Sequence, residues 1–127
     1  MKVRSYRDLE VWQKGMVLAE ACYSVTKPFP KDEMFGLTSQ IRRAAVSVPA
    51  NIAEGQGRFH TKEFIQHLGI ARGSINELET HLELANRVGL VPLDALNRLV
   101  SMSDEIGRMI WGLRRRLDDR SANGSDH

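Results

Sequence analysis

The sequence has a single cysteine, few aromatic residues and no long apolar run. Because Cys22 has no second cysteine to pair with, an internal disulfide is excluded, and we expect a reducing compartment. The longest stretch without a charged residue, 44–53, has ten residues, whereas a membrane-spanning helix needs about twenty. Charges at Lys2, Arg4 and Arg7 leave no apolar segment for a signal peptide. We therefore expect a cytoplasmic protein that has no membrane partner.

Proline and glycine divide the chain into four segments, with breaks at 28–30, 55–57 and 89–92. Within each segment apolar residues recur at alternating spacings of three and four, the period of an amphipathic helix, and none alternates as a strand would. The expected core positions are Leu9, Trp12, Met16, Ala19, Tyr23 and Thr26; Leu37, Ile41, Ala44 and Val48; Phe64, Leu68, Ala71, Ile75, Leu78, Leu82 and Ala85; and Leu96, Leu99, Ser103, Ile106, Ile110, Leu113 and Leu117. The pattern predicts an all-α, antiparallel up-down four-helix bundle over residues 1–119, followed by a disordered tail over 120–127.

Apolar residues outside these core positions suggest that the bundle assembles into a homo-oligomer. On the first segment a second apolar stripe recurs every seven residues, about 130° from the expected core face. On the fourth segment a methionine row flanks the core and a tryptophan lies further out. A monomeric bundle needs only one apolar stripe per helix, so we expect these residues to contact another subunit. They are Val11, Leu18, Val25, Met102, Met109 and Trp111.

Glycines inside the third and fourth segments also suggest contact with another helix. Gly69, Gly73, Gly107 and Gly112 each cost about 1 kcal/mol relative to alanine in a helix. We expect them to permit the close approach of another helix, although accidental tolerance is the alternative.

Residue pairs that could support catalysis or metal binding do not have the required arrangement. Carboxylate-bridged metal sites in bundles use Glu-x-x-His pairs that point inward. Here Glu63 and His67, like Glu77 and His81, are spaced i,i+4 and lie off the core positions, so we interpret them as exposed helix-face pairs. Cys22 lies among apolar residues, where an inert buried thiol is expected. We therefore expect no enzyme activity, no metal and no cofactor.

The positive charge has a suggestive distribution, although 18 basic and 16 acidic residues give a net charge of only +2. Arg42 and Arg43 lie on the most apolar of the four segments, and Arg58 follows it. One interpretation is that glutamates of the same chain neutralise these arginines. The other is that the arginines bind phosphate, for which the bidentate guanidinium is well suited. The candidate internal partners are Glu54, Glu77 and Glu79.

Several runs of sequence resemble the small bacterial "four helix bundle protein" family, also called 23S rRNA intervening-sequence proteins. The longest is LTSQIRRAAVSVPANIAEG at 37–55, and shorter runs lie at 6–12, 63–64, 70–74, 77–80 and 106–109. The resemblance implies a four-helix bundle that forms a homopentamer and has no known catalytic residues. It extends to basic pentameric accessory proteins of retroelements, which bind nucleic acid and the reverse transcriptase. The matching positions that could contact nucleic acid are Arg42, Arg43, Arg58 and Arg72.

Two functions are consistent with these features. The first is a non-enzymatic homo-oligomer, a pentamer by resemblance, that binds RNA or an RNA–protein assembly; DNA is a further possible partner. Near-neutrality weighs against very strong nucleic-acid binding. The alternative is a protein-only scaffold or adaptor that engages a protein partner through Trp111 and the row of Met102 and Met109.

Overall fold

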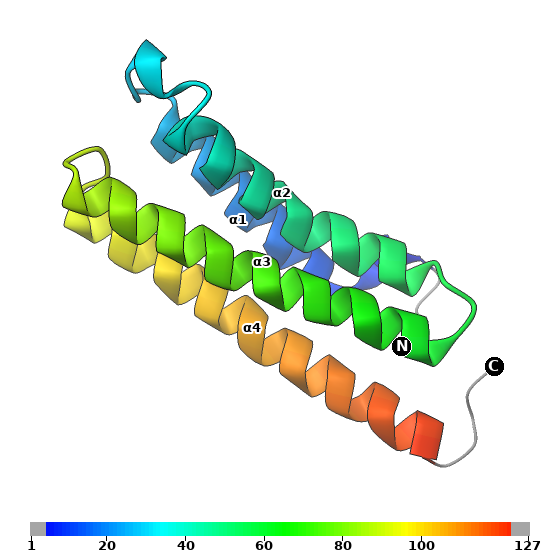
Figure 1. Cartoon of the computed structure of the whole chain (residues 1–127). Coiled ribbons are helices and arrows are strands. Elements are labelled where there is room, and N and C mark those ends of the chain that lie inside the picture. Colours follow the sequence, from blue (N-terminus) through cyan, green and yellow to red (C-terminus); the bar gives the residue numbers. More distant parts are fainter. Residues whose placement is uncertain (1–4, 123–127) are drawn as a thin grey trace.

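The computed structural model describes residues 5–122, which form four long α-helices and two short 3-10 helices. Consecutive helices are antiparallel, and α4 returns to lie against α1, so the four helices close a bundle (Figure 1). The elements are η1 Tyr6–Asp8, α1 Glu10–Thr26, η2 Lys31–Glu33, α2 Leu37–Gln56, α3 Thr61–Arg87 and α4 Leu93–Ala122. Within 5–122 there is no strand, and the predicted all-α four-helix fold is confirmed. No helix in this range is apolar for long enough to cross a membrane.

The end of α4 differs from the expected boundary. Helix α4 continues to Ala122, so residues 120–122 belong to the bundle's last helix rather than to a disordered tail. The remainder of the predicted tail, 123–127, lies outside the described residues.

The core confirms most of the expected positions on α2, α3 and α4. Of the expected α3 positions all but Phe64 are buried, and of those on α4 all but Leu113; both exceptions are partly buried against the core. On α2, Ile41, Ala44 and Val48 are buried as expected.

The face of α1 that enters the core differs from the prediction. Val11 and Leu18, predicted to face another subunit, are 4% and 0% exposed inside the single chain, and Val25 is partly buried against the same core. Of the predicted core residues, Ala19 and Thr26 are buried and Leu9 and Trp12 are partly buried, but Met16 and Tyr23 are exposed. The prediction that Val11 and Leu18 lie on an outer surface is therefore wrong.

Close packing of α1 against α2 explains this rotation. A Cβ built on Gly15 would lie 3.3 Å from Cβ of Pro49, so the two helices nearly touch there. The buried face of α1 places Gly15 at this contact, where a larger side chain would meet Pro49. Steric fit therefore decides between two apolar stripes of similar hydrophobicity.

Helices α2 and α3 approach closely at Gly55. A Cβ on Gly55 would lie 2.7 Å from Cβ of His67 and 3.0 Å from the Phe64 ring. By contrast, nothing lies within 4 Å of the same position on Gly69, Gly73 or Gly107, and only the Arg116 guanidinium approaches Gly112, at 3.8 Å. The expected role of these four glycines in close helix packing is therefore wrong for contacts within the chain.

We expect Gly55→Ala to destabilise the bundle, although alanine is the better helix former. Overpacking costs about 1–3 kcal/mol, which exceeds the gain of about 1 kcal/mol in helix propensity. Gly69→Ala is the matched control and is expected to raise the free energy of unfolding by up to about 1 kcal/mol. Urea unfolding followed by circular dichroism measures both, and equal stabilities would contradict the close approach at Gly55.

Candidate nucleic-acid interface

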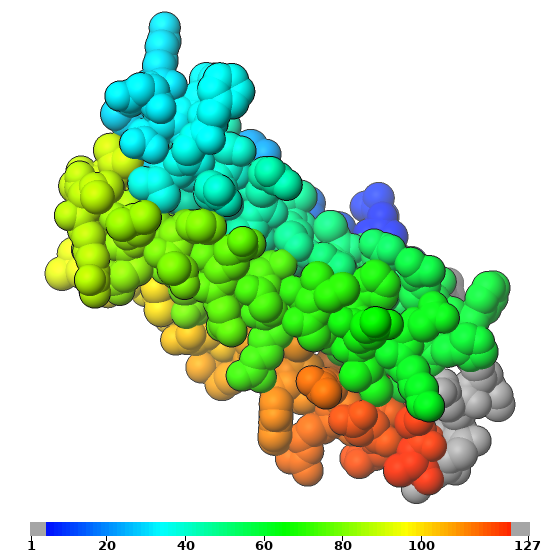
Figure 2. All heavy atoms as spheres, viewed as in Figure 1, coloured from blue at the N-terminus to red at the C-terminus, as the bar shows by residue number. Residues whose placement is uncertain are grey.

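A groove of about 500 Å³ lies where α1 ends, the connecting loop turns and α2 begins. We call it the hairpin groove. The loop segment around it projects at one end of the bundle, coloured cyan in Figure 2. The lining residues are Tyr23, Thr26, Lys27, Phe29, Pro30, Lys31, Met34, Phe35, Thr38, Ser39, Arg42 and Arg43.

The hairpin groove is strongly biased toward positive charge. Lys27, Lys31, Arg42 and Arg43 line it, and among the described residues no carboxylate does. Residues 21–43 contain these four cations and two acidic residues, a net of +2 that equals the net charge of the whole chain. The segment that forms the hairpin groove therefore carries a net positive charge, and the charges of the other 104 residues of the sequence sum to zero.

One acidic side chain of the loop, that of Glu33, is turned toward the backbone. The Glu33 carboxylate accepts a hydrogen bond from the Leu37 N–H at 3.1 Å, and so caps the start of α2. Gly36 permits this, because a Cβ at that position would lie 2.9 Å from Glu33 Oε1. A carboxylate at a helix N-terminus is stabilised by the unpaired amides.

Arg42 is held between α1 and α2. Its Nε donates a hydrogen bond to Thr26 Oγ1 at 2.9 Å, and its guanidinium lies 4.5 Å from the centre of the Tyr23 ring. The Thr26 hydroxyl in turn donates to the Cys22 carbonyl at 2.8 Å. Arg42 therefore stabilises the α1–α2 contact and lines the groove at the same time.

Arg43 is exposed and makes no ion pair with any described residue. None of the three glutamates considered as internal partners pairs with Arg42 or Arg43. Arg43 is thus available for a ligand in the groove, together with Lys27 and Lys31.

The structure separates the other two predicted arginines from this groove. Arg58 lies at the opposite end of α2, about 22 Å from Arg43 along the helix axis. Its guanidinium pairs with Glu54 at 2.7 Å and approaches Glu63 at 3.9 Å. Arg72 lines a different groove, between α3 and α4. The four predicted arginines therefore do not form one surface.

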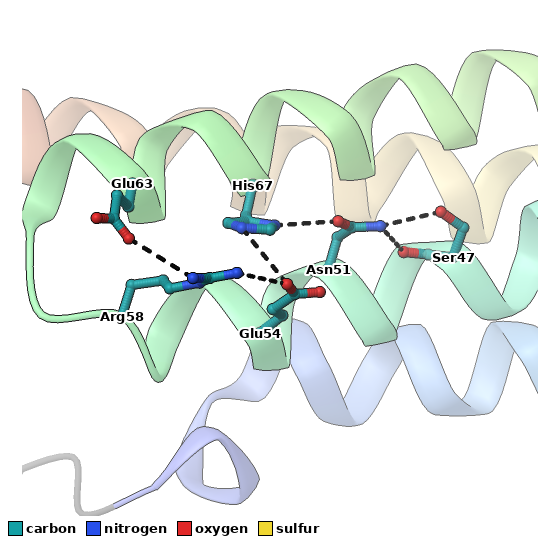
Figure 3. A network of polar contacts seen from close by, with 6 residues as sticks. All are labelled: Ser47, Asn51, Glu54, Arg58, Glu63 and His67. Carbon is teal, nitrogen blue, oxygen red and sulfur yellow. Dashed lines mark hydrogen bonds and ion pairs between the residues drawn. The ribbon is translucent and has the colours of Figure 1, made fainter.

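Arg58 belongs to a ladder of polar contacts that joins α2 and α3 (Figure 3). Asn51 Nδ2 donates to Ser47 Oγ at 3.0 Å, and Asn51 Oδ1 lies 3.2 Å from His67 Nδ1. His67 Nε2 is 3.8 Å from Glu54, which pairs with Arg58. Polar side chains of α2, among them Asn51 and Glu54, therefore contact α3.

The His–Glu pairs do not assemble a metal site. His67 is partly buried and faces Asn51 and Glu54 rather than Glu63, so its interpretation as an exposed pair with Glu63 is wrong. His81 Nε2 lies 4.0 Å from Glu77, as the i,i+4 spacing predicts, but His81 is partly buried and its Nε2 is a buried atom with no hydrogen bond, so this pair is not fully exposed either. Among the described residues no group of three or more His, Cys, Asp or Glu side chains could hold a metal ion.

The cysteine is poorly suited to nucleophilic chemistry. Cys22 is fully buried, and desolvation by burial raises the pKa of its thiol to about 12. The thiolate is the reactive form, so little of it is present at neutral pH.

The remaining residues of the expected oligomer interface lie on α4. Trp111 is 52% exposed, with the Arg115 guanidinium 4.9 Å from its ring centre, while Met102 and Met109 are partly buried against the core. Trp111 lines the groove of about 460 Å³ between α3 and α4, beside Arg72 and Gly107.

Sequence reasoning identified only Arg42 and Arg43 in the hairpin groove and missed its other lining residues, among them two lysines and an exposed phenylalanine. Lys27 and Lys31 flank the two prolines of the loop, and Phe35 precedes α2. The sequence does show four basic residues and an aromatic residue around one helical hairpin. It does not show that the loop brings them to the same side, and this is seen only in the structure.

Arg42→Ala is expected to lower the free energy of unfolding, whereas Arg43→Ala is expected to leave it nearly unchanged. Loss of a part-buried hydrogen bond to a charged group costs about 1.5–3 kcal/mol, and we expect about 1–2 kcal/mol because Arg42 keeps some solvent contact. Arg42→Lys keeps the charge without the planar guanidinium and should fall between the two. Urea unfolding of the three variants measures this, and equal losses for Arg42→Ala and Arg43→Ala would contradict the structural role.

Comparisons with known proteins agree with this architecture. No curated protein matches the chain. The crystal structure of a protein of unknown function from the S23 ribosomal protein family of Bacteroides thetaiotaomicron is similar, with a TM-score of 0.74 and 26% sequence identity. The match covers 82% of this chain and 97% of that one. The model of the 23S rRNA-intervening sequence protein family matches residues 7–112. The chain therefore belongs to the 23S rRNA-intervening sequence protein family.

Proposed function

We propose that this protein is a non-enzymatic, homo-oligomeric binding protein of the cytoplasm whose hairpin groove contacts the phosphates of RNA or of an RNA–protein assembly. The observation that carries the proposal is the hairpin groove itself, lined by four cations and, among the described residues, by no carboxylate. Lysine and arginine supply most of the affinity of proteins for nucleic acid by displacing counterions from the phosphates.

A single groove with a small excess of charge gives weak binding, and assembly would compensate. Several copies on one ring raise the effective concentration of each groove for the same polynucleotide. Exposed Trp111 supports an interface on the α3–α4 side. The family resemblance favours five copies.

The proposal predicts steep salt dependence for RNA binding. We expect Lys31→Ala with Arg43→Ala to weaken binding at low salt and to flatten the slope of log K against log[salt] by about 0.7–0.9 per lost contact. Fluorescence anisotropy with a labelled oligoribonucleotide measures the slope.

The matched control is Arg114→Ala, which removes an exposed arginine at the opposite end of the bundle. Its effect on the slope should be small. Equal effects of Arg114→Ala and Arg43→Ala would mean that total charge, rather than the hairpin groove, attracts RNA. If RNA and DNA both fail to bind at low salt, the nucleic-acid proposal fails.

The second candidate function is a protein-only scaffold or adaptor, favoured by the exposed Trp111 in the α3–α4 groove. If Trp111 lies in the subunit interface as we propose, Trp111→Ala should lower the molar mass of the assembly, because a buried aromatic anchor contributes strongly to an interface. Leu93→Ala, at the start of the same helix, is the control. Sedimentation velocity measures both, and an unchanged mass for Trp111→Ala would favour the scaffold function instead.

A further inference from the structure

Phe35 is the most exposed large apolar side chain of the described residues and lines the hairpin groove. It is 94% exposed, so its ring contributes almost nothing to the core. It follows the short helix η2 and precedes α2, where the Glu33 cap and the hydrogen bond from Gly36 N–H to the Glu33 carbonyl fix the turn. An ordered turn thus holds an aromatic ring in solvent beside Lys31 and Arg43.

The groove has a second aromatic surface. Tyr23 is exposed on α1 and lines the same groove, with the Arg42 guanidinium against its ring at 4.5 Å. Aromatic rings and stacked guanidinium planes bind nucleobases through their faces, and cations between them bind the connecting phosphates. The hairpin groove combines these elements, whereas a site for phosphates alone would need only the cations.

We infer that the hairpin groove selects unpaired nucleotides, with a base stacked on Phe35 and the adjoining phosphates on Arg43 and Lys31. This inference rests on the proposed binding of RNA and specifies which form of RNA is bound. A base in a duplex is already stacked between its neighbours, so its face cannot reach Phe35, and a duplex can use only the cations.

The test compares a short labelled oligouridine with a stable RNA hairpin that has the same number of phosphates and a non-nucleotide linker in place of its loop, so that all of its bases are paired. At equal salt we expect the oligouridine to bind about ten-fold more tightly, the typical contribution of one stacked base. Phe35→Ala should remove this preference without changing the affinity for the hairpin, and Phe35→Tyr should retain it. Because the ring is in solvent, Phe35→Ala should keep the unfolding midpoint of the parent chain.

Phe59→Ala is a close control, since Phe59 is 92% exposed in the turn at the other end of α2, beside an arginine paired with Glu54. It should leave both affinities unchanged. Arg43→Ala should weaken both probes and flatten both salt slopes, because phosphates are common to them.

The outcomes separate this inference from the function on which it rests. If oligouridine and hairpin bind equally, or if Phe35→Ala and Phe59→Ala have the same effect, selection of unpaired bases is wrong while RNA binding stands. If neither probe binds at low salt, both fail. If Phe35→Ala lowers the mass of the assembly, Phe35 is a subunit contact, and the stacking role is overturned.

Discussion

Helix α2 lies so close to both of its neighbours that the side chains at two positions are limited in size. Gly15 of α1 lies against Pro49, and Gly55 of α2 lies against the backbone-proximal atoms of Phe64 and His67. Protein interiors are close-packed, so a difference of one methyl group at such a contact shifts whole helices. The rotation of α1, the polar ladder between α2 and α3, and the geometry of the hairpin groove all depend on this packing.

The same packing gives two neighbouring arginines different roles. Arg42 faces α1, where Thr26 and the Tyr23 ring hold it, and Arg43, one residue further along the helix, points to solvent. Successive helical residues are about 100° apart, so two adjacent arginines on a largely buried helix can face different surroundings. The hairpin groove thus has one cation held in place and others available for a ligand.

Prediction from sequence succeeds where one apolar stripe dominates a helix. On α3 and α4 the large residues recur in a single stripe, and the structure buries almost all of them. On α1 two stripes compete, and the predicted stripe is only partly correct. Ala19 and Thr26 are buried and Trp12 is partly buried, but Met16 and Tyr23 are exposed. The buried stripe contains Gly15, whose lack of a side chain allows the close contact with Pro49 of α2, and a periodicity argument does not register such a fit.

The candidate site, like the fold, could be predicted only in part from the sequence. The sequence by itself determined the four helices, the breaks between them and the family, because these follow from local periodicity and contiguous motifs. Only the tertiary structure decided which cations share a surface. The loop between α1 and α2 places Lys27 and Lys31 in the same groove as Arg43, whereas Arg58 pairs with Glu54 at the far end of α2. Charges act through distances in space, and these distances are set by how the helices pack.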